Sequence, residues 1–226
     1  MRIWQMLLMG DDGVTVGPSI VGTPVVTTGT TSSTTKSVTL PATVPAGSRI
    51  VIEISVSSGG TNTMTAPSGF SVISGAAQAS ATCNGSAFYK DADGSEGGTS
   101  VTVTLASATT SHVAIAYCVT GHDAATPPEA ASTTGTSTTP NPPSLTPSWG
   151  SAENLWFAAY GSRINTTAVS GYPTNYTVSQ ASGVANIVSN AMAARLLTAS
   201  SEDPATFAVG GVSVNWYAVT IAVKPA

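Results

Sequence analysis

The chain has 226 residues, of which 42% are hydrophobic and only 8% are charged. Its 34 Thr, 30 Ser, 22 Gly and 14 Pro supply 100 residues, so the chain lacks the charge that solvates helices but keeps too many apolar residues to be disordered. Seven basic and eleven acidic residues give a net charge of −4. The basic residues are scattered, which excludes the clustered basic stripe of a nucleic-acid-binding protein.

Residues 1–22 open the chain and are predicted to form an extended arm. Their apolar run is short, contains Gln5, and stops at Asp11 and Asp12 without a small-residue cleavage site. We therefore expect a structural arm rather than a signal peptide, and no segment of the chain reaches the ~20 apolar residues of a membrane helix. An exposed apolar segment of this kind usually docks on a partner. The predicted docking residues are Ile3, Trp4, Met6, Leu7, Leu8 and Met9.

The next part of the chain carries recurring strand patterns separated by Gly- and Ser-rich turns. Residues 49–58 alternate apolar and polar side chains, which predicts a half-buried strand with Arg49 and Glu53 paired on its solvent-facing side. Cys83 and Cys118 fall within strand patterns and are expected to be buried free thiols. The strands predicted in this half cover residues 49–58, 70–74, 81–90, 99–107 and 111–120.

The second half repeats the order of these patterns at an offset near 104–105 residues. Its predicted strands cover residues 153–162, 170–178, 185–195, 204–209 and 216–223. The shared order indicates an internal duplication of residues 31–121 and 133–226. Segment 185–199 has the Ala, Met, Leu and Arg content of a helix, but the repeat favours a strand there. Residues 122–148, rich in Pro and Thr, are predicted to link the halves in an extended conformation.

These patterns predict an all-β fold: an antiparallel, jelly-roll-like sandwich built from the internal duplication, with the arm at residues 1–22 and the sandwich at residues 23–226. Two arrangements of the halves remain open. They can intercalate into one sandwich with pseudo-twofold symmetry, or they can form two tandem immunoglobulin-like sandwiches. We favour the single sandwich because only 6% of the residues are aromatic, so either half alone would have a thin core.

The sequence offers no group of residues typical of a catalytic, cofactor or metal site. His112 is expected to pack at the start of a strand, and His122 is expected in solvent at the start of the linker. Residues 91–96 (DADGSE) cluster oxygen ligands around a glycine. They lack the length and ligand number of a calcium loop, which favours a hairpin turn. No nucleophile elbow, phosphate-binding loop or zinc-protease motif is present. We therefore expect no enzyme activity, no cofactor and no metal.

Aromatic residues of the second half suggest a separate hypothesis. Exposed Trp and Tyr rings can stack on sugar rings, although aromatic side chains in strands usually pack in the core. The candidate glycan platform consists of Trp149, Trp156, Tyr172 and Tyr176.

Three motifs carry a resemblance to a known group of proteins. They are the pattern SGF at 68–70 with SGY at 170–172, the strand SAFYK at 86–90, and the closing run NWYAVTIAVKPA at 215–226. Over residues 31–226 the chain resembles the virion β-sandwich proteins of tailed bacteriophages, which decorate (cement) the capsid or associate with the tail.

The resemblance implies a non-catalytic structural protein of the virion, assembled in the host cytoplasm. We expect a capsid decoration or cement protein that packs on the major capsid protein or on other virion proteins, without nucleic acid or membrane as a partner. The symmetry of a shell implies a closed homo-oligomer such as a trimer. The alternative is a tail-tip or fibre protein, or a secreted adhesion module, that binds glycans.

Overall fold

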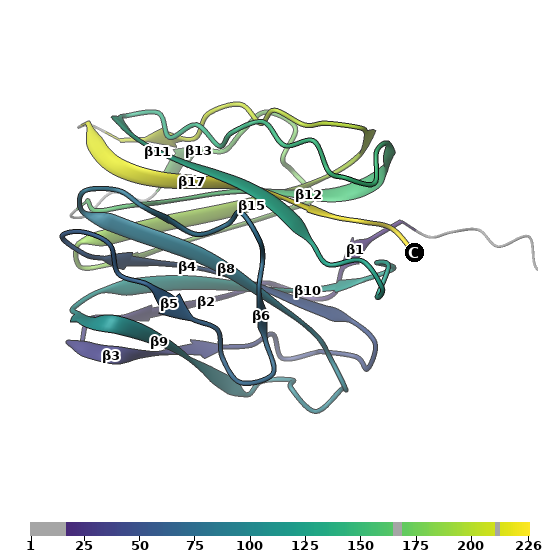
Figure 1. Ribbon diagram of the computed structural model, residues 1–226, viewed down its shortest axis with the longest axis horizontal. Coiled ribbons are helices and arrows are strands. Elements are labelled where there is room, and N and C mark those ends of the chain that lie inside the picture. Colours follow the sequence, from purple (N-terminus) through teal and green to yellow (C-terminus); the bar gives the residue numbers. More distant parts are fainter. Residues whose placement is uncertain (1–16, 165–168, 211–212) are drawn as a thin grey trace, which may run out of the picture.

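The computed structural model describes residues 17–164, 169–210 and 213–226, which fold into strands and connecting loops (Figure 1). All strand pairings within these ranges are antiparallel. The all-β fold and the strand at residues 185–199 are therefore confirmed. Among the same residues, no helix has the length and apolar character needed to cross a membrane.

The first half of the chain builds one main sheet. Its strands are β1 (Ser19–Ile20), β2 (Val25–Gly29), β4 (Arg49–Ser57), β6 (Ser71–Val72), β7 (Gln78–Ala79), β8 (Cys83–Asp91) and β10 (His112–Thr120). The long strands lie at the centre in the order β10–β4–β8. The short strands β1 and β2 pair with β10, and β6 and β7 pair with β8, so the two edges of the sheet are short and irregular.

The second half builds a matching main sheet. Its strands are β11 (Glu129–Ser137), β12 (Ala152–Ser162), β14 (Ser179–Ala185), β15 (Val188–Ala199) and β17 (Val214–Val223). Their order is β11–β17–β12–β15–β14, so the central trio β17–β12–β15 has the connectivity of β10–β4–β8. Ile115, Glu53 and Ala87 lie side by side across the first trio. Val219, Ala159 and Met192 lie side by side across the second, at offsets of 104, 106 and 105 residues.

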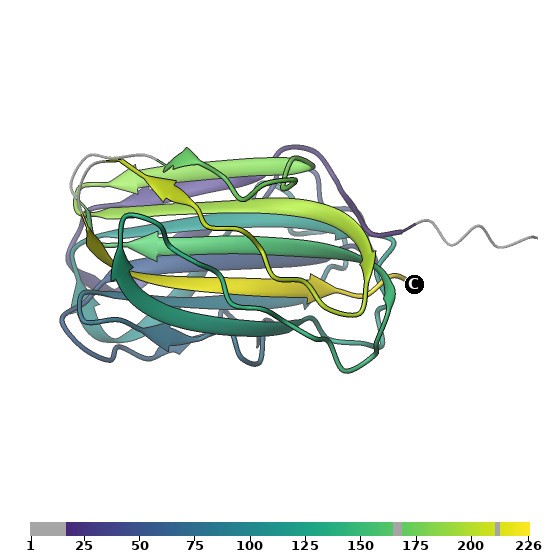
Figure 2. The ribbon, with the colours of Figure 1, turned by 90° about the horizontal axis from the view of Figure 1, so that it is seen from above.

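The two main sheets pack face to face, and their contact forms the central core (Figure 1). Strand β4 lies against β12, β10 against β15, and β8 against β17, as a twofold axis along the strands requires. Tyr117 packs on Phe157 with ring centroids 5.1 Å apart, and its hydroxyl donates a hydrogen bond to the Met192 carbonyl at 3.1 Å. Figure 2 shows the strands of both sheets running along the long axis of the molecule.

Each main sheet comes from one half of the chain only, so the favoured arrangement, in which the two halves intercalate, is wrong. The halves stack through their main sheets and do not intercalate strands within one sheet. Each half has a core of its own between its main sheet and its outer layer, and the shared interface adds a central core to which both halves contribute.

A thinner outer layer covers the far face of each main sheet. The outer strands are β3 (Ser33–Thr39), β5 (Met64–Thr65) and β9 (Ser100–Thr109) over the first sheet, and β13 (Val169–Gly171) and β16 (Ala208–Val209) over the second. Both faces of β4 are therefore buried. The expected half-buried strand with Arg49 and Glu53 in solvent is wrong, since both side chains are fully buried.

Two predicted boundaries also need correction. Strand β11 lies inside the predicted linker 122–148 and pairs along its whole length with β17. The prolines of that segment flank this run of Ala, Ser and Thr without interrupting it, so its backbone N–H groups remain free to pair. Strand β1 lies inside the predicted arm 1–22 and pairs with the end of β10. The six predicted docking residues of the arm, from Ile3 to Met9, lie outside the described residues.

Candidate functional site

Charged side chains gather at one end of the molecule, which also holds the C terminus and β1 (Figure 1). Gly17 lies at this end beside the Glu153 carboxylate, so the preceding residues join the body there. We call it the charged end. Its charged residues are Arg49, Lys90, Asp91, Asp93, Glu96, Asp123, Glu129, Glu153, Arg195, Glu202, Asp203 and Lys224.

The opposite end carries loops rich in Ser, Thr, Asn and Gly, and we call it the hydroxyl end. It consists of the segments 57–63, 80–83, 107–111, 162–164, 186–189 and 213–215. Outside the charged end, the described part of the chain has only three charged residues. Glu53 is buried between the main sheets, the Lys36 side chain is buried, and Arg163 is exposed.

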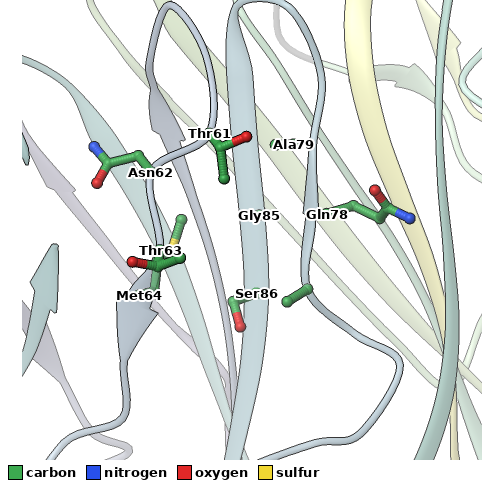
Figure 3. Close-up of a pocket in the computed structure, with 9 residues that line it drawn as sticks. Thr61, Asn62, Thr63, Met64, Gln78, Ala79, Gly85 and Ser86 are labelled. Carbon is green, nitrogen blue, oxygen red and sulfur yellow. The ribbon is translucent and has the colours of Figure 1, made fainter. Parts of the chain in front are cut away.

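One pocket on the flank near the hydroxyl end has a volume of about 350 Å³ (Figure 3). Its floor is Gly85 and Ser86 of β8, and its walls are the segments 61–64 and 77–79. Figure 3 shows Thr61 and the Met64 thioether between these walls, whereas the Asn62 and Gln78 amides point away. The volume lies within the range of small-molecule sites, but the lining has no carboxylate, imidazole, amine or thiol. Such a lining can bind a neutral ligand but offers no acid, base or strong nucleophile.

Two buried amide side chains hold the 60–63 wall of this pocket in place. Asn62 donates to the Ser107 carbonyl at 2.9 Å and accepts from the Ser107 N–H at 3.0 Å. Asn84 donates to the Gly60 carbonyl at 2.9 Å. These side-chain hydrogen bonds hold the 60–63 segment in the way that strand pairing would, so this wall of the pocket is ordered without a ligand.

A buried carboxyl lies between the main sheets. Glu53 accepts a hydrogen bond from the Ser55 hydroxyl at 3.0 Å and another from the Asn190 side-chain amide. Burial raises its pKa to about 8, against the smaller opposing effect of these two hydrogen bonds. The Cys83 thiol and the Tyr217 hydroxyl also lie near it, and burial raises the pKa of each above its ordinary value. Glu53 is fully buried between the main sheets and does not line the pocket formed over Gly85 and Ser86.

A second polar cluster ties the connection between the halves to the charged end. The Arg49 guanidinium holds both oxygens of Asp91, at 2.7 and 2.9 Å, and donates to the Thr126 carbonyl at 2.8 Å. His122 lies 3.1 Å from the same carboxylate. His122 is buried rather than solvated as expected, because the chain after β10 folds back over Arg49. Burial, aided by the Arg49 charge, lowers the pKa of His122.

Other sequence expectations can be compared directly with the structure. His112 is buried at the start of β10 with its Nε2 3.1 Å from the Ser37 carbonyl, as expected. Residues 92–99 form a turn in which Glu96 accepts from the backbone N–H groups of Asp93 and Gly94. The predicted hairpin is wrong, because this turn leads from β8 in the main sheet to β9 in the outer layer and the two strands do not pair. Cys83 and Cys118 are buried free thiols. Within the described ranges, no cluster of three metal-ligating side chains occurs.

The candidate glycan platform is not a continuous exposed surface. Trp156 and Tyr176 are fully buried beneath the outer layer of the second half, whereas Trp149 and Tyr172 are only partly buried. The expectation of four exposed rings is therefore wrong, because β13, β16 and their loops cover this face of β12.

Sequence reasoning missed the residues that surround Glu53. Two signals in the sequence could have indicated a buried polar contact. One is the single acid within the apolar run RIVIEISVS, and the other is Asn190 at the start of an Ala-rich strand. Comparisons with protein-family models, curated proteins and solved structures gave no match to this chain.

Proposed function

We propose that this protein is a non-catalytic structural protein of a virion, a capsid decoration or cement protein that docks through its N-terminal segment. The observation that carries the proposal is the division of the molecule into two ends. Gly17, the first described residue after the apolar stretch of the sequence, lies at the charged end, while the hydroxyl end lies at the far end of the long axis. An attachment at one end leaves the other free to face solvent.

Two further features support a role in packing rather than chemistry. The described histidines are both buried in structural contacts, and the buried acid Glu53 does not line the pocket over Gly85 and Ser86. The stacked sheets bury nearly all residues of the central strands, which produces a rigid block suited to surface packing.

The test begins with quantitative mass spectrometry of purified virus particles from the source culture. A copy number comparable to that of the major shell protein supports decoration, and a few copies support a tail or fibre position. Absence from clean particles overturns the virion assignment.

The docking segment is tested by a truncation that removes residues 1–16. The truncation stops there because Ser19 and Ile20 belong to β1. We expect the truncated protein to keep its unfolding midpoint and to stop co-sedimenting with particles that lack this chain. Leu7→Asp should show the same loss, and Gln5→Asp, which changes a polar residue of the same segment, should bind. Binding by the truncated protein would contradict the docking assignment.

A further inference from the structure

The hydroxyl end contains two hollows that share two residues. One, of about 250 Å³, is lined by Ser57, Ser58, Gly59, Ala108, Thr109, Thr110, Arg163 and Ile187. The other, of about 480 Å³, is lined by Thr82, Arg163, Ile164, Ile187, Ser213, Val214 and Asn215. Because Arg163 and Ile187 line both, the two hollows adjoin, and we refer to them together as the groove; its lining runs from loops of the first half to loops of the second.

The chemistry of this groove differs from that of the protein as a whole. The chain has a net charge of −4, yet among the described residues the groove lining has no acidic residue and one guanidinium, that of Arg163. A second cation lies behind it, since the buried Lys36 ammonium donates to the Thr109 carbonyl at 2.6 Å and to the Thr31 carbonyl at 3.1 Å. In the described residues no carboxylate forms an ion pair with either cation.

Apart from Glu53, which is buried between the main sheets, the acids of the described residues lie at the charged end, so they do not neutralise this positive field at close range. The lining also carries accessible hydroxyl groups, those of Thr110 and Ser213 at exposed positions and those of Ser58 and Thr82 at half-buried positions. The groove therefore combines a positive charge, which can form an ion pair with an anionic ligand, with protein hydroxyl groups, which can form hydrogen bonds with the hydroxyl groups of a ligand.

We propose that this groove binds an acidic polysaccharide, with the Arg163 guanidinium pairing with a carboxylate of the sugar chain. Ser, Thr and Asn side chains match the alternating donors and acceptors of sugar hydroxyls, and Ile187 offers an apolar contact for a ring face. An elongated groove fits a linear chain better than an isolated anion. One exposed cation is too few for a nucleic acid, whose binding requires many phosphate contacts. This inference does not depend on the virion assignment.

The test measures binding of the full chain to polygalacturonate, alginate and hyaluronate oligosaccharides by titration calorimetry. The methyl-esterified form of polygalacturonate serves as the matched neutral ligand, and a single-stranded oligonucleotide serves as an anion without the sugar-acid pattern. We expect binding to at least one uronate-bearing oligosaccharide that weakens with added salt, and no binding to the methyl ester. Failure to bind all three acidic polymers, or equal binding of the ester or the oligonucleotide, overturns the proposal.

Three variants locate the site. Arg163→Ala should weaken binding at least about 10-fold, because a charge-assisted bond is lost. Thr110→Glu places a carboxylate on an exposed turn beside the groove and should weaken binding similarly. Lys224→Gln removes the same unit of charge at the charged end and should bind as the wild type does. Unchanged binding by Arg163→Ala and Thr110→Glu, both at exposed positions, would contradict this location.

Discussion

The buried Glu53 carboxyl predicts an unusual dependence of stability on pH. Its pKa in the folded protein is about 8, against 4.5 for an ordinary Glu. In the interval between these values the folded protein holds a proton that the unfolded chain releases. The free energy of unfolding contributed by Glu53 is therefore fully present below about pH 4.5 and falls as the pH rises to about 8.

The size of the effect follows from the width of the interval. Each pH unit corresponds to about 1.4 kcal/mol, so the whole interval corresponds to at most about 5 kcal/mol. His112 and His122 oppose the trend, because burial lowers the pKa of both below the ordinary value of 6.5. Their contribution is complete above pH 6.5, and between that pH and about 8 the Glu53 effect alone amounts to about 2 kcal/mol.

Glu53→Gln removes the titration while keeping the contacts. The Gln carbonyl can accept from the Asn190 amide, and its amide can donate to the Ser55 hydroxyl, so both observed hydrogen bonds keep a partner. We expect this variant to unfold at the same urea concentration as the wild type at low pH and to become more stable than the wild type as the pH rises, by at most about 5 kcal/mol at pH 8, of which about 2 kcal/mol is gained between pH 6.5 and about 8.

The assay is urea denaturation followed by tryptophan fluorescence at a series of pH values, with Glu153→Gln as the control at an exposed position. The control should keep the wild-type profile. Parallel profiles of the wild type and Glu53→Gln would refute the reasoning, because the buried acid would then titrate as it does in water.

Three more substitutions test the packing of the two halves. Gly85→Ala should lower stability by about 1–3 kcal/mol, because its Cβ would lie 1.9 Å from the Tyr217 ring; Gly59→Ala, where a Cβ meets nothing within 4 Å, is the control, and equal denaturation midpoints would contradict the close packing of β8 on β17. Arg49→Met should cost about 3 kcal/mol in denaturation experiments, since it leaves Asp91 and His122 without the guanidinium; an unchanged midpoint would show that the cluster does not stabilise the fold. Trp156→Ala should cost about 3–5 kcal/mol by opening the core of the second half; an unchanged denaturation midpoint would contradict the close packing of this core.

The sequence predicts the long strands well because their apolar residues alternate or run continuously between clear turns. It predicts burial poorly. The alternation in β4 predicts that Glu53 and Ser55 face solvent. Period-two alternation distinguishes the two faces of a strand, but it does not reveal what covers each face. The second main sheet covers that side, so a polar residue there needs a partner such as Asn190, which is distant in sequence.

Composition misleads in a similar way for β11 and for the aromatic residues. Segment 122–148 reads as a linker because its prolines dominate the average, although the nine residues of β11 contain none. The sequence makes Trp156 and Tyr176 candidates for sugar stacking because it does not predict the layer that covers them. That layer consists of β13, β16 and loops, whose strand patterns are weak. The groove around Arg163 could not be predicted, since its lining comes from loops that the fold alone brings together.

The face-to-face packing of two similar sheets gives this chain the form of a dimer held within one polypeptide. Association of the two sheets is unimolecular, so their contact does not weaken on dilution as it would between separate subunits. In a symmetric homodimer every side chain occurs twice, once in each subunit. The two halves of a single polypeptide can differ at any position. Glu53 and Ala159 occupy matching places in the two trios. Two identical subunits would place a second acid in the same interior, whereas this chain places the acid on one side alone and leaves the small alanine on the other.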